Sequence, residues 1–241
     1  MAQNRSSAVM QQRHEAPDSL DDFPTPPWAS RALCEELVRR GHQLHLHRAW
    51  EPACNRGYMA AALAEYFDQV HATDVHDYGW PGQACQADFL IDWGQDAPDV
   101  DWVVTNPPFR LAGDFIRQAL RHAKVGVAVF VRSAFIEGQE RYASLFRDQP
   151  ESLFMPFVER VALWRGVLLD PERQVWRDDP DGGGLRYPTS ATSYAWLVWI
   201  KSMPPGATLM HRIGPCRREL TRPADYPPIP EHLRPPGGGL L

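Results

Sequence analysis

The chain is poor in cysteine and lysine, and it has no long apolar run. No stretch reaches the roughly 20 apolar residues of a membrane helix, and the N-terminus lacks the apolar core of a signal peptide. The four cysteines are scattered, without the paired spacing of a metal site, and we expect them to be small buried or neutral residues. We therefore predict a cytoplasmic protein with no bound metal.

Positive charge comes almost entirely from arginine, because Lys124 and Lys201 are the only lysines. The net charge of −5 argues against a surface coated with phosphate-binding residues, although it allows a local basic face. Neither a Ser/His/Asp or Cys/His nucleophile array nor a phosphate-binding loop is recognisable. At 241 residues the chain is long enough for one α/β domain with an insertion.

The most informative stretch is Asn106-Pro107-Pro108-Phe109. It follows an apolar, β-branched run that predicts a buried strand, and two prolines then end that strand. Ligands of open α/β sheets bind where such strands end. The Asn106 side-chain oxygen and the Pro107 carbonyl could accept both hydrogens of an exocyclic NH2 group, and Phe109 could stack on its ring. A plain Asn-Pro turn that closes the strand is the alternative.

A second set of residues precedes this turn. Glu51, Ala53, Asn55 and Gly57 lie between a predicted strand and a predicted helix, where small residues let a ligand approach the backbone. Asn55 tolerates left-handed backbone better than other non-glycine residues. Asp74 ends the next predicted strand, about 20 residues after the loop begins, where nucleotide-binding folds place a carboxylate for ribose. Asp77, just beyond it, is a weaker candidate.

Residues 106–109 resemble the catalytic Asn/Asp-Pro-Pro-Tyr/Phe motif of class I, S-adenosylmethionine-dependent methyltransferases acting on amino groups. The best-known members of that family make N6-methyladenine in DNA. Residues 51–57 resemble the cofactor loop of the family, Glu-Pro-x-x-Gly-x-Gly, with Asn55 in place of its first glycine. The strongest likeness is to small phage-encoded adenine methyltransferases without a large recognition domain.

This resemblance covers roughly residues 23–200 and implies a Rossmann-like α/β fold. The expected sheet is mostly parallel and seven-stranded, with an antiparallel last strand, paired with 158–164, and helices on both faces. The cofactor would be S-adenosylmethionine and the substrate DNA with its target base flipped out. The oligomeric state is left open.

The resemblance also assigns further residues to the cofactor. Thr25 and Pro26 would line its methionine end, Asp88 would contact its adenine amino group, and Phe89 would flank that ring. Asn106 would serve the cofactor as well as the substrate. From the residues alone, Thr25 is an N-cap and Pro26 the first residue of a helix that ends at Gly41.

Outside this domain we predict a disordered tail at 1–22 and a basic, then Pro/Gly-rich C-terminal tail at 201–241. The insertion 165–191 is a candidate target-recognition loop. Nucleic acid could meet Arg132, which follows the fifth predicted strand, and Arg217 and Arg218 in the basic tail.

Other functions fit the same residues. Related motifs modify RNA bases and protein glutamine, and a cofactor-binding protein without catalysis would also keep the loop. A nicotinamide-dependent oxidoreductase is a third class, because Asp74 suits any ribose, although no proton-donating His or Tyr pair is apparent.

Overall fold

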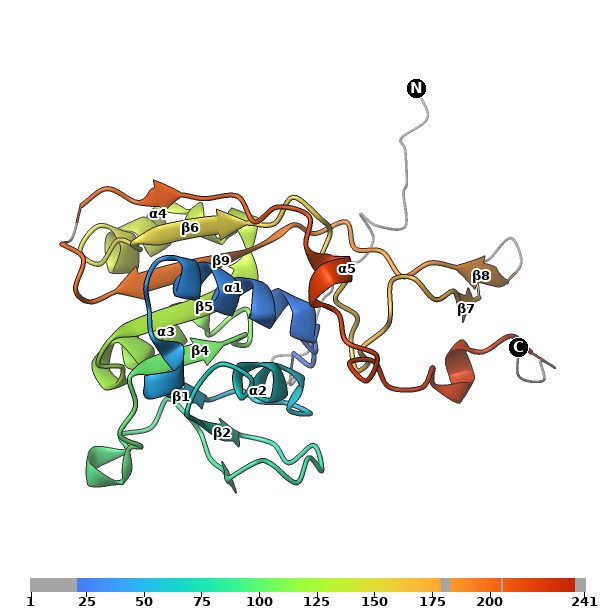
Figure 1. The fold of residues 1–241 in the computed structure, drawn as a ribbon, viewed down its shortest axis with the longest axis horizontal. Coiled ribbons are helices and arrows are strands. Elements are labelled where there is room, and N and C mark those ends of the chain that lie inside the picture. Colours follow the sequence, from blue (N-terminus) through green and yellow to red (C-terminus); the bar gives the residue numbers. More distant parts are fainter. Residues whose placement is uncertain (1–20, 179–182, 205, 237–241) are drawn as a thin grey trace.

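The structure is a computed structural model that describes residues 21–178, 183–204 and 206–236 (Figure 1). Its centre is an eight-stranded sheet in the order β10-β6-β9-β5-β4-β1-β2-β3. The strands are β1 (Arg48–Glu51), β2 (Gln69–Asp74), β3 (Cys85–Gln86), β4 (Trp102–Thr105), β5 (Gly126–Arg132), β6 (Leu153–Pro156), β9 (Tyr194–Ile200) and β10 (Leu209–Met210). Neighbours pair in parallel except β9, which is antiparallel to both β5 and β6. The predicted fold class is confirmed, with β10 as an eighth strand.

Central strands of such a sheet are covered on both faces and need nearly continuous apolar sequence. In β4 every residue is buried, and in β5 only Arg132, at its carboxyl end, is exposed. Gly126 begins β5 directly over the Trp102 indole, where an added Cβ would lie 2.5 Å from the ring. A side chain at this position would therefore displace the indole from the core.

Helices cover both faces of the sheet. The helices α1 (Pro27–Arg39) and α2 (Tyr58–Leu63) lie on one face, and α3 (Ala112–His122) lies on the other. Leu33 and Leu37 of α1 share a buried cluster with Val104 and Phe130. Ile116 of α3 belongs to the opposite cluster, where it meets the alternate side chains of the same strands. Among the described helices, none is long and apolar enough to cross a bilayer.

The start of α1 differs from the prediction. Pro26 occupies the N-cap position, and no side chain caps the helix. The Thr25 hydroxyl instead accepts a hydrogen bond from Asn106. Gly41, just beyond the end of α1, has a φ of 91°, as expected for a residue that ends a helix.

The strand predicted at 158–164 is wrong. β6, at Leu153–Pro156, takes its place beside β9. Residues 158–164 form no strand, but Val161 and Leu163 are buried in the core. Burial of an irregular segment produces the same apolar pattern as a strand, so the sequence could not distinguish them.

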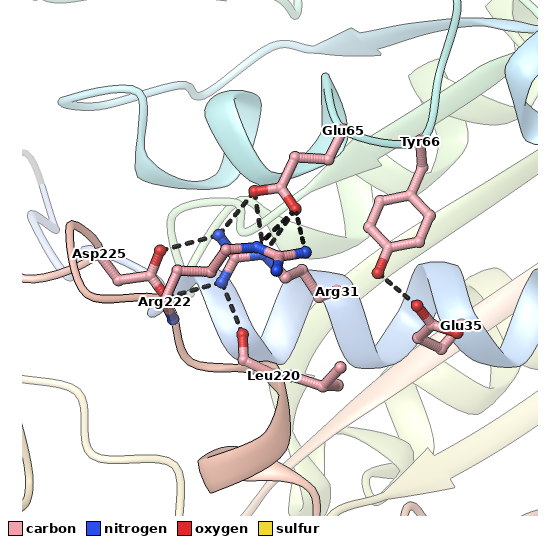
Figure 2. A network of polar contacts seen from close by, with 7 residues as sticks. All are labelled: Arg31, Glu35, Glu65, Tyr66, Leu220, Arg222 and Asp225. Atoms are coloured by element: carbon pink, nitrogen blue, oxygen red, sulfur yellow. Dashed lines mark hydrogen bonds and ion pairs between the residues drawn. The ribbon is translucent and has the colours of Figure 1, made fainter.

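Both terminal segments contact the domain. Residues 1–20 of the predicted N-terminal tail lie outside the described residues, but Asp22 hydrogen-bonds to the 51–57 loop and Asp21 to the 106–109 turn. The C-terminal segment adds β10 to the sheet, and its short helix α5 (Arg217–Leu220) lies against α1. A buried ion pair between Arg31 and Asp225 anchors it (Figure 2). Such contacts give this segment a fixed place that its composition does not predict.

The predicted insertion carries its own two-stranded sheet, β7 (Val175–Arg177) and β8 (Gly184–Arg186). This hairpin extends away from the main sheet, beyond the edge where the parallel strands end (Figure 1). Residues 179–182 at its tip lie outside the described residues.

Candidate active site

A pocket opens at the carboxyl edge of the sheet, where β1, β2 and β4 end. Its empty volume is about 870 Å³, including the part open to solvent. The predicted site residues that line it are Thr25, Glu51, Ala53, Asn55, Asp74, Asp88, Phe89, Asn106 and Pro108. The topology brings these positions together because parallel strands end at the same edge of a sheet.

The Asn106 side chain is held by two hydrogen bonds. Its amide nitrogen donates to the Phe23 carbonyl at 3.0 Å and to the Thr25 hydroxyl at 2.9 Å. These partners identify which end of the amide is nitrogen and use both of its N–H donors. The side-chain oxygen is therefore oriented as an acceptor, which is the role that binding of an exocyclic amine requires.

The aromatic ring of Phe109 has a cation over it. The Arg132 guanidinium lies 4.3 Å from the ring centroid, and the Phe23 ring lies 5.5 Å away with a tilt of 40°. The Phe109 backbone N–H donates to the Asp21 carboxylate at 2.5 Å. Arg132 thus lies beside the 106–109 turn, at the sheet edge where β5 ends. A planar base that stacks on this face must displace its guanidinium.

Glu51 is the least solvated acid of the pocket, with 2% of its surface exposed. Burial raises the pKa of the Glu51 carboxyl well above its usual range, and the charge of Asp74 adds to this effect. Its Oε2 atom has no hydrogen-bond partner among the described residues. A buried acceptor of this kind suits a cationic ligand group, because an ammonium would supply the missing donor.

We expect Glu51→Gln to stabilise the ligand-free protein. A raised folded-state pKa contributes stability that is present below the ordinary value of 4.5 and is lost as pH rises through the folded value. The neutral amide removes this loss. The Tm at pH 8 should therefore exceed that of the wild type by at least about 2 °C. The difference should shrink as pH falls toward 4.5, and equal Tm values across the range would contradict the assignment.

The Asp74 carboxylate joins the 51–57 loop to the turn that follows β2. Its oxygens accept from the backbone N–H groups of Asn55 and His76, each at 2.9 Å. A carboxylate has about four lone-pair directions, so acceptors remain for two ribose hydroxyls. Burial raises the pKa of Asp74, and the hydrogen bonds from His76 and Asn55 oppose that rise.

Asn55 has a φ of 50°, so the predicted left-handed conformation is confirmed. Gly57 is also left-handed, and an added Cβ would lie 2.1 Å from the Trp80 indole. A glycine is therefore required at position 57 for two reasons. The side chain of Asn55 does more than tolerate its backbone, since it donates to the Asp22 carboxylate at 2.8 Å.

Other predicted residues lie at the margin. Asp88 is exposed at the rim, and its carboxylate accepts from the Leu90 N–H. Phe89 is 1% exposed and meets the Trp50 ring edge-on at 4.9 Å, so it mainly fills the core. Asp77 is exposed and accepts from the Gly79 N–H. Of the predicted catalytic and cofactor-binding residues, four do not line the pocket, although each adjoins a residue that does: Pro26, Gly57, Pro107 and Phe109.

Sequence reasoning missed several lining residues, among them Asp21, Tyr58, Tyr78 and Phe115. Phe115 could have been found, because α3 follows the 106–109 turn directly and its apolar stripe faces the sheet. Asp21 carries no local pattern, since only tertiary contacts bring it to the pocket.

The predicted basic residues of the C-terminal segment are paired with acids. Arg218 donates to Glu172 at 2.8 Å, and Arg217 contacts both Glu172 and Glu159. Arg218 is nevertheless largely exposed. A phosphate would have to compete with carboxylates for both guanidinium groups.

Solved structures with the same arrangement of strands and helices exist. A type I restriction-modification methyltransferase subunit from Streptococcus thermophilus gives a TM-score of 0.53 at 10% identity, over 79% of this chain and 47% of its own. A protein from Listeria monocytogenes described as a class I S-adenosylmethionine-dependent methyltransferase gives a TM-score of 0.50 at 14% identity. The match covers 90% of this chain and 72% of that protein. The fold is that of class I methyltransferases.

A modification subunit of a type I restriction enzyme from Vibrio vulnificus gives a TM-score of 0.50 at 13% identity. The match covers 85% of this chain and 49% of that subunit. This chain therefore spans about half the length of both restriction-modification subunits. Neither the protein-family models nor the curated proteins contain a match to the sequence.

Proposed function

We propose that this protein is an S-adenosylmethionine-dependent methyltransferase that modifies the exocyclic N6 amine of adenine in DNA. The observation that carries this proposal is the fixed amide of Asn106. Its donors are used by Phe23 and Thr25, and its oxygen is left as an acceptor beside a pocket that holds Glu51 and Asp74.

The pocket residues fit the cofactor. Glu51 offers a buried acceptor without a partner to the cofactor's ammonium, and Asp74 offers two acceptor positions to its ribose. When bound, the cofactor supplies a methyl group on a sulfonium, which is an electrophile. Asn106 lines this pocket and begins the turn that carries Phe109, so an amine held by Asn106 would face the cofactor.

Asn106 has a defined chemical task in this proposal. The lone pair of the adenine amine is delocalised into the ring, and acceptors on its two hydrogens shift electron density onto nitrogen. The Asn106 oxygen and the Pro107 carbonyl are the proposed acceptors. No separate base is needed before attack, because the proton becomes acidic once the methyl group has been transferred.

Base stacking gives Phe109 and Arg132 linked roles. A duplex hides the amine, so the base must be flipped out at a cost of a few kcal/mol and held against an aromatic face. Phe109 offers that face, and Arg132, displaced from it, remains near enough to meet a phosphate of the flipped nucleotide. The β7–β8 hairpin extends beyond the edge of the sheet where the parallel strands end (Figure 1). The pocket residues lie at that same edge, which supports the proposed role of the hairpin as a recognition element.

The direct test is transfer of a tritiated methyl group to DNA, RNA and protein, followed by nucleoside analysis. Label in N6-methyladenine from DNA supports the proposal. Label in RNA or in protein glutamine would show that the substrate is RNA or protein instead of DNA. Binding of S-adenosylhomocysteine without transfer to any substrate would indicate a cofactor-binding protein that does not catalyse.

We predict that Asp74→Ala weakens S-adenosylhomocysteine binding without unfolding the protein. Losing a hydrogen bond to a buried charge costs about 1.5–3 kcal/mol, which corresponds to roughly ten- to a hundredfold in Kd. Calorimetry measures the affinity, and Asp77→Ala is the matched control because that carboxylate is exposed. Wild-type affinity of Asp74→Ala would remove Asp74 from the site.

Neutralising Arg217 and Arg218 should reduce DNA affinity and its salt dependence. Each phosphate contact that is lost lowers the slope of log K against log salt by about 0.9. Their pairing with Glu172 predicts a loss of fewer than two contacts from the double variant. Arg147→Gln, which removes an exposed arginine paired with Asp148, is the control. An unchanged slope would show that Arg217 and Arg218 do not belong to the DNA-binding surface.

A further inference from the structure

Residues Asp21–Thr25, which we name the N-terminal strap, contact parts of the pocket that are distant in sequence. Asp22 holds the cofactor loop. Its carboxylate accepts from the Asn55 amide at 2.8 Å and from the Arg56 guanidinium at 2.8 and 3.0 Å. Asn55 in turn accepts from the Arg56 backbone N–H at 2.8 Å. The acid, the amide and the guanidinium therefore form one closed cluster at the pocket wall.

The same strap holds the catalytic turn. Asp21 accepts from the Phe109 N–H, while the Phe23 carbonyl and the Thr25 hydroxyl accept from Asn106. Asp21, Phe23 and Thr25 also line the pocket. Five consecutive residues thus reach both the group that would bind the cofactor and the group that would bind the amine.

A third contact reaches the proposed recognition element. The Gly166 N–H donates to the Asp22 carbonyl at 2.8 Å, and Gly166 opens the segment that leads to the β7–β8 hairpin. Gly166 has a φ of 73°, a conformation in which a side chain would be strained. Asp22 therefore contacts the insertion through its backbone carbonyl and the cofactor loop through its side chain.

We propose that Asp22, Asn55 and Arg56 act as positioning residues that couple cofactor binding to the geometry of Asn106 and Phe109 through the strap. The coupling to the cofactor rests on the proposed function, whereas the coupling between the loop and the turn does not. This role explains why asparagine replaces the glycine of the family pattern. A glycine could adopt the same φ, but only the amide side chain can donate to Asp22.

A merely local role for Asp22 makes a different prediction. If the cluster only stabilised residues 51–57, its loss would leave the turn at 106–109 unchanged, because within the described part of the chain Asp22 forms no hydrogen bond to that turn. If the strap transmits the effect, loss of the Asp22 charge loosens Asp21, Phe23 and Thr25 as well. Backbone amides of the turn then become less protected from exchange.

The test measures hydrogen exchange and S-adenosylhomocysteine affinity in Asp22→Asn, Arg56→Gln and the double variant. Asp68→Asn is the control, because it makes the same charge change at an exposed position. We expect Asp22→Asn to speed exchange in peptides covering 103–112 by about fivefold or more. We also expect it to weaken S-adenosylhomocysteine binding by about five- to tenfold. The double variant should lose no more than the larger single loss, because both changes break one cluster.

Each outcome decides a separate point. Faster exchange at 103–112 in Asp22→Asn, but not in Asp68→Asn, supports transmission through the strap whether or not a cofactor binds. Control-level exchange there, or losses that simply add in the double variant, overturns the proposal. A wild-type protein that does not bind S-adenosylhomocysteine refutes the proposed function. In that case hydrogen exchange alone tests whether the strap couples the loop to the turn.

Discussion

Asn106→Ala is expected to reduce methyl transfer at least about 100-fold while leaving S-adenosylhomocysteine affinity within a few-fold of the wild type. Loss of one preorganised hydrogen-bonding group in an active site typically costs this much in turnover. The structure supports such preorganisation, because Phe23 and Thr25 fix the amide before any substrate is present. Single-turnover transfer to DNA measures the chemical step, and calorimetry measures the affinity. Near-normal adenine methylation would overturn the mechanism.

Two further variants separate this effect from disturbance of the turn. Thr105→Val changes the adjacent residue, whose buried hydroxyl has no partner among the described residues, so its activity should stay close to normal. Asn106→Asp keeps an acceptor but loses the donors to the Phe23 carbonyl and the Thr25 hydroxyl. A charged carboxylate there would face a carbonyl oxygen, so Asn106→Asp should lose most activity although aspartate occurs in the family motif.

The core of the site could be predicted because strand ends are local features. The sequence places Glu51, Asp74 and Asn106 directly after three apolar runs, and parallel pairing brings those ends to one edge. Their common location follows from topology once the fold class is known. Their proposed roles go further than this location and depend on the experiments above.

The strap could not be predicted, because its contacts are not local. Asp21 and Asp22 end a polar segment whose composition predicts disorder, and nothing near them in sequence indicates that Asn55 or Phe109 will meet them. The strand at 158–164 was predicted wrongly for a related reason, since burial by tertiary contacts imitates strand periodicity. In both cases the deciding interactions join residues far apart in the chain.

Arg31→Met is expected to have the largest effect on stability. Arg31 is buried in α1 and donates to both oxygens of Asp225 at 2.6 and 2.8 Å, to Glu65 and to the Leu220 carbonyl (Figure 2). Removing it leaves the Asp225 carboxylate buried without its cation. Breaking a buried pair from one side typically costs about 3–5 kcal/mol. Urea unfolding followed by tryptophan fluorescence should show this decrease in the free energy of unfolding.

The double variant Arg31→Met with Asp225→Asn tests the cause of that loss. If an uncompensated charge dominates, neutralising Asp225 should recover a substantial part of the stability, because the remaining amide can still accept from the Arg222 N–H. Arg222→Gln is the matched control, since its side chain is exposed and, among the described residues, forms its ion pair with the partly exposed Glu65. An exposed ion pair contributes about 0–1 kcal/mol, so this variant should be nearly neutral. Equal losses from Arg31→Met and Arg222→Gln would show that the buried pair does not anchor the C-terminal segment to α1.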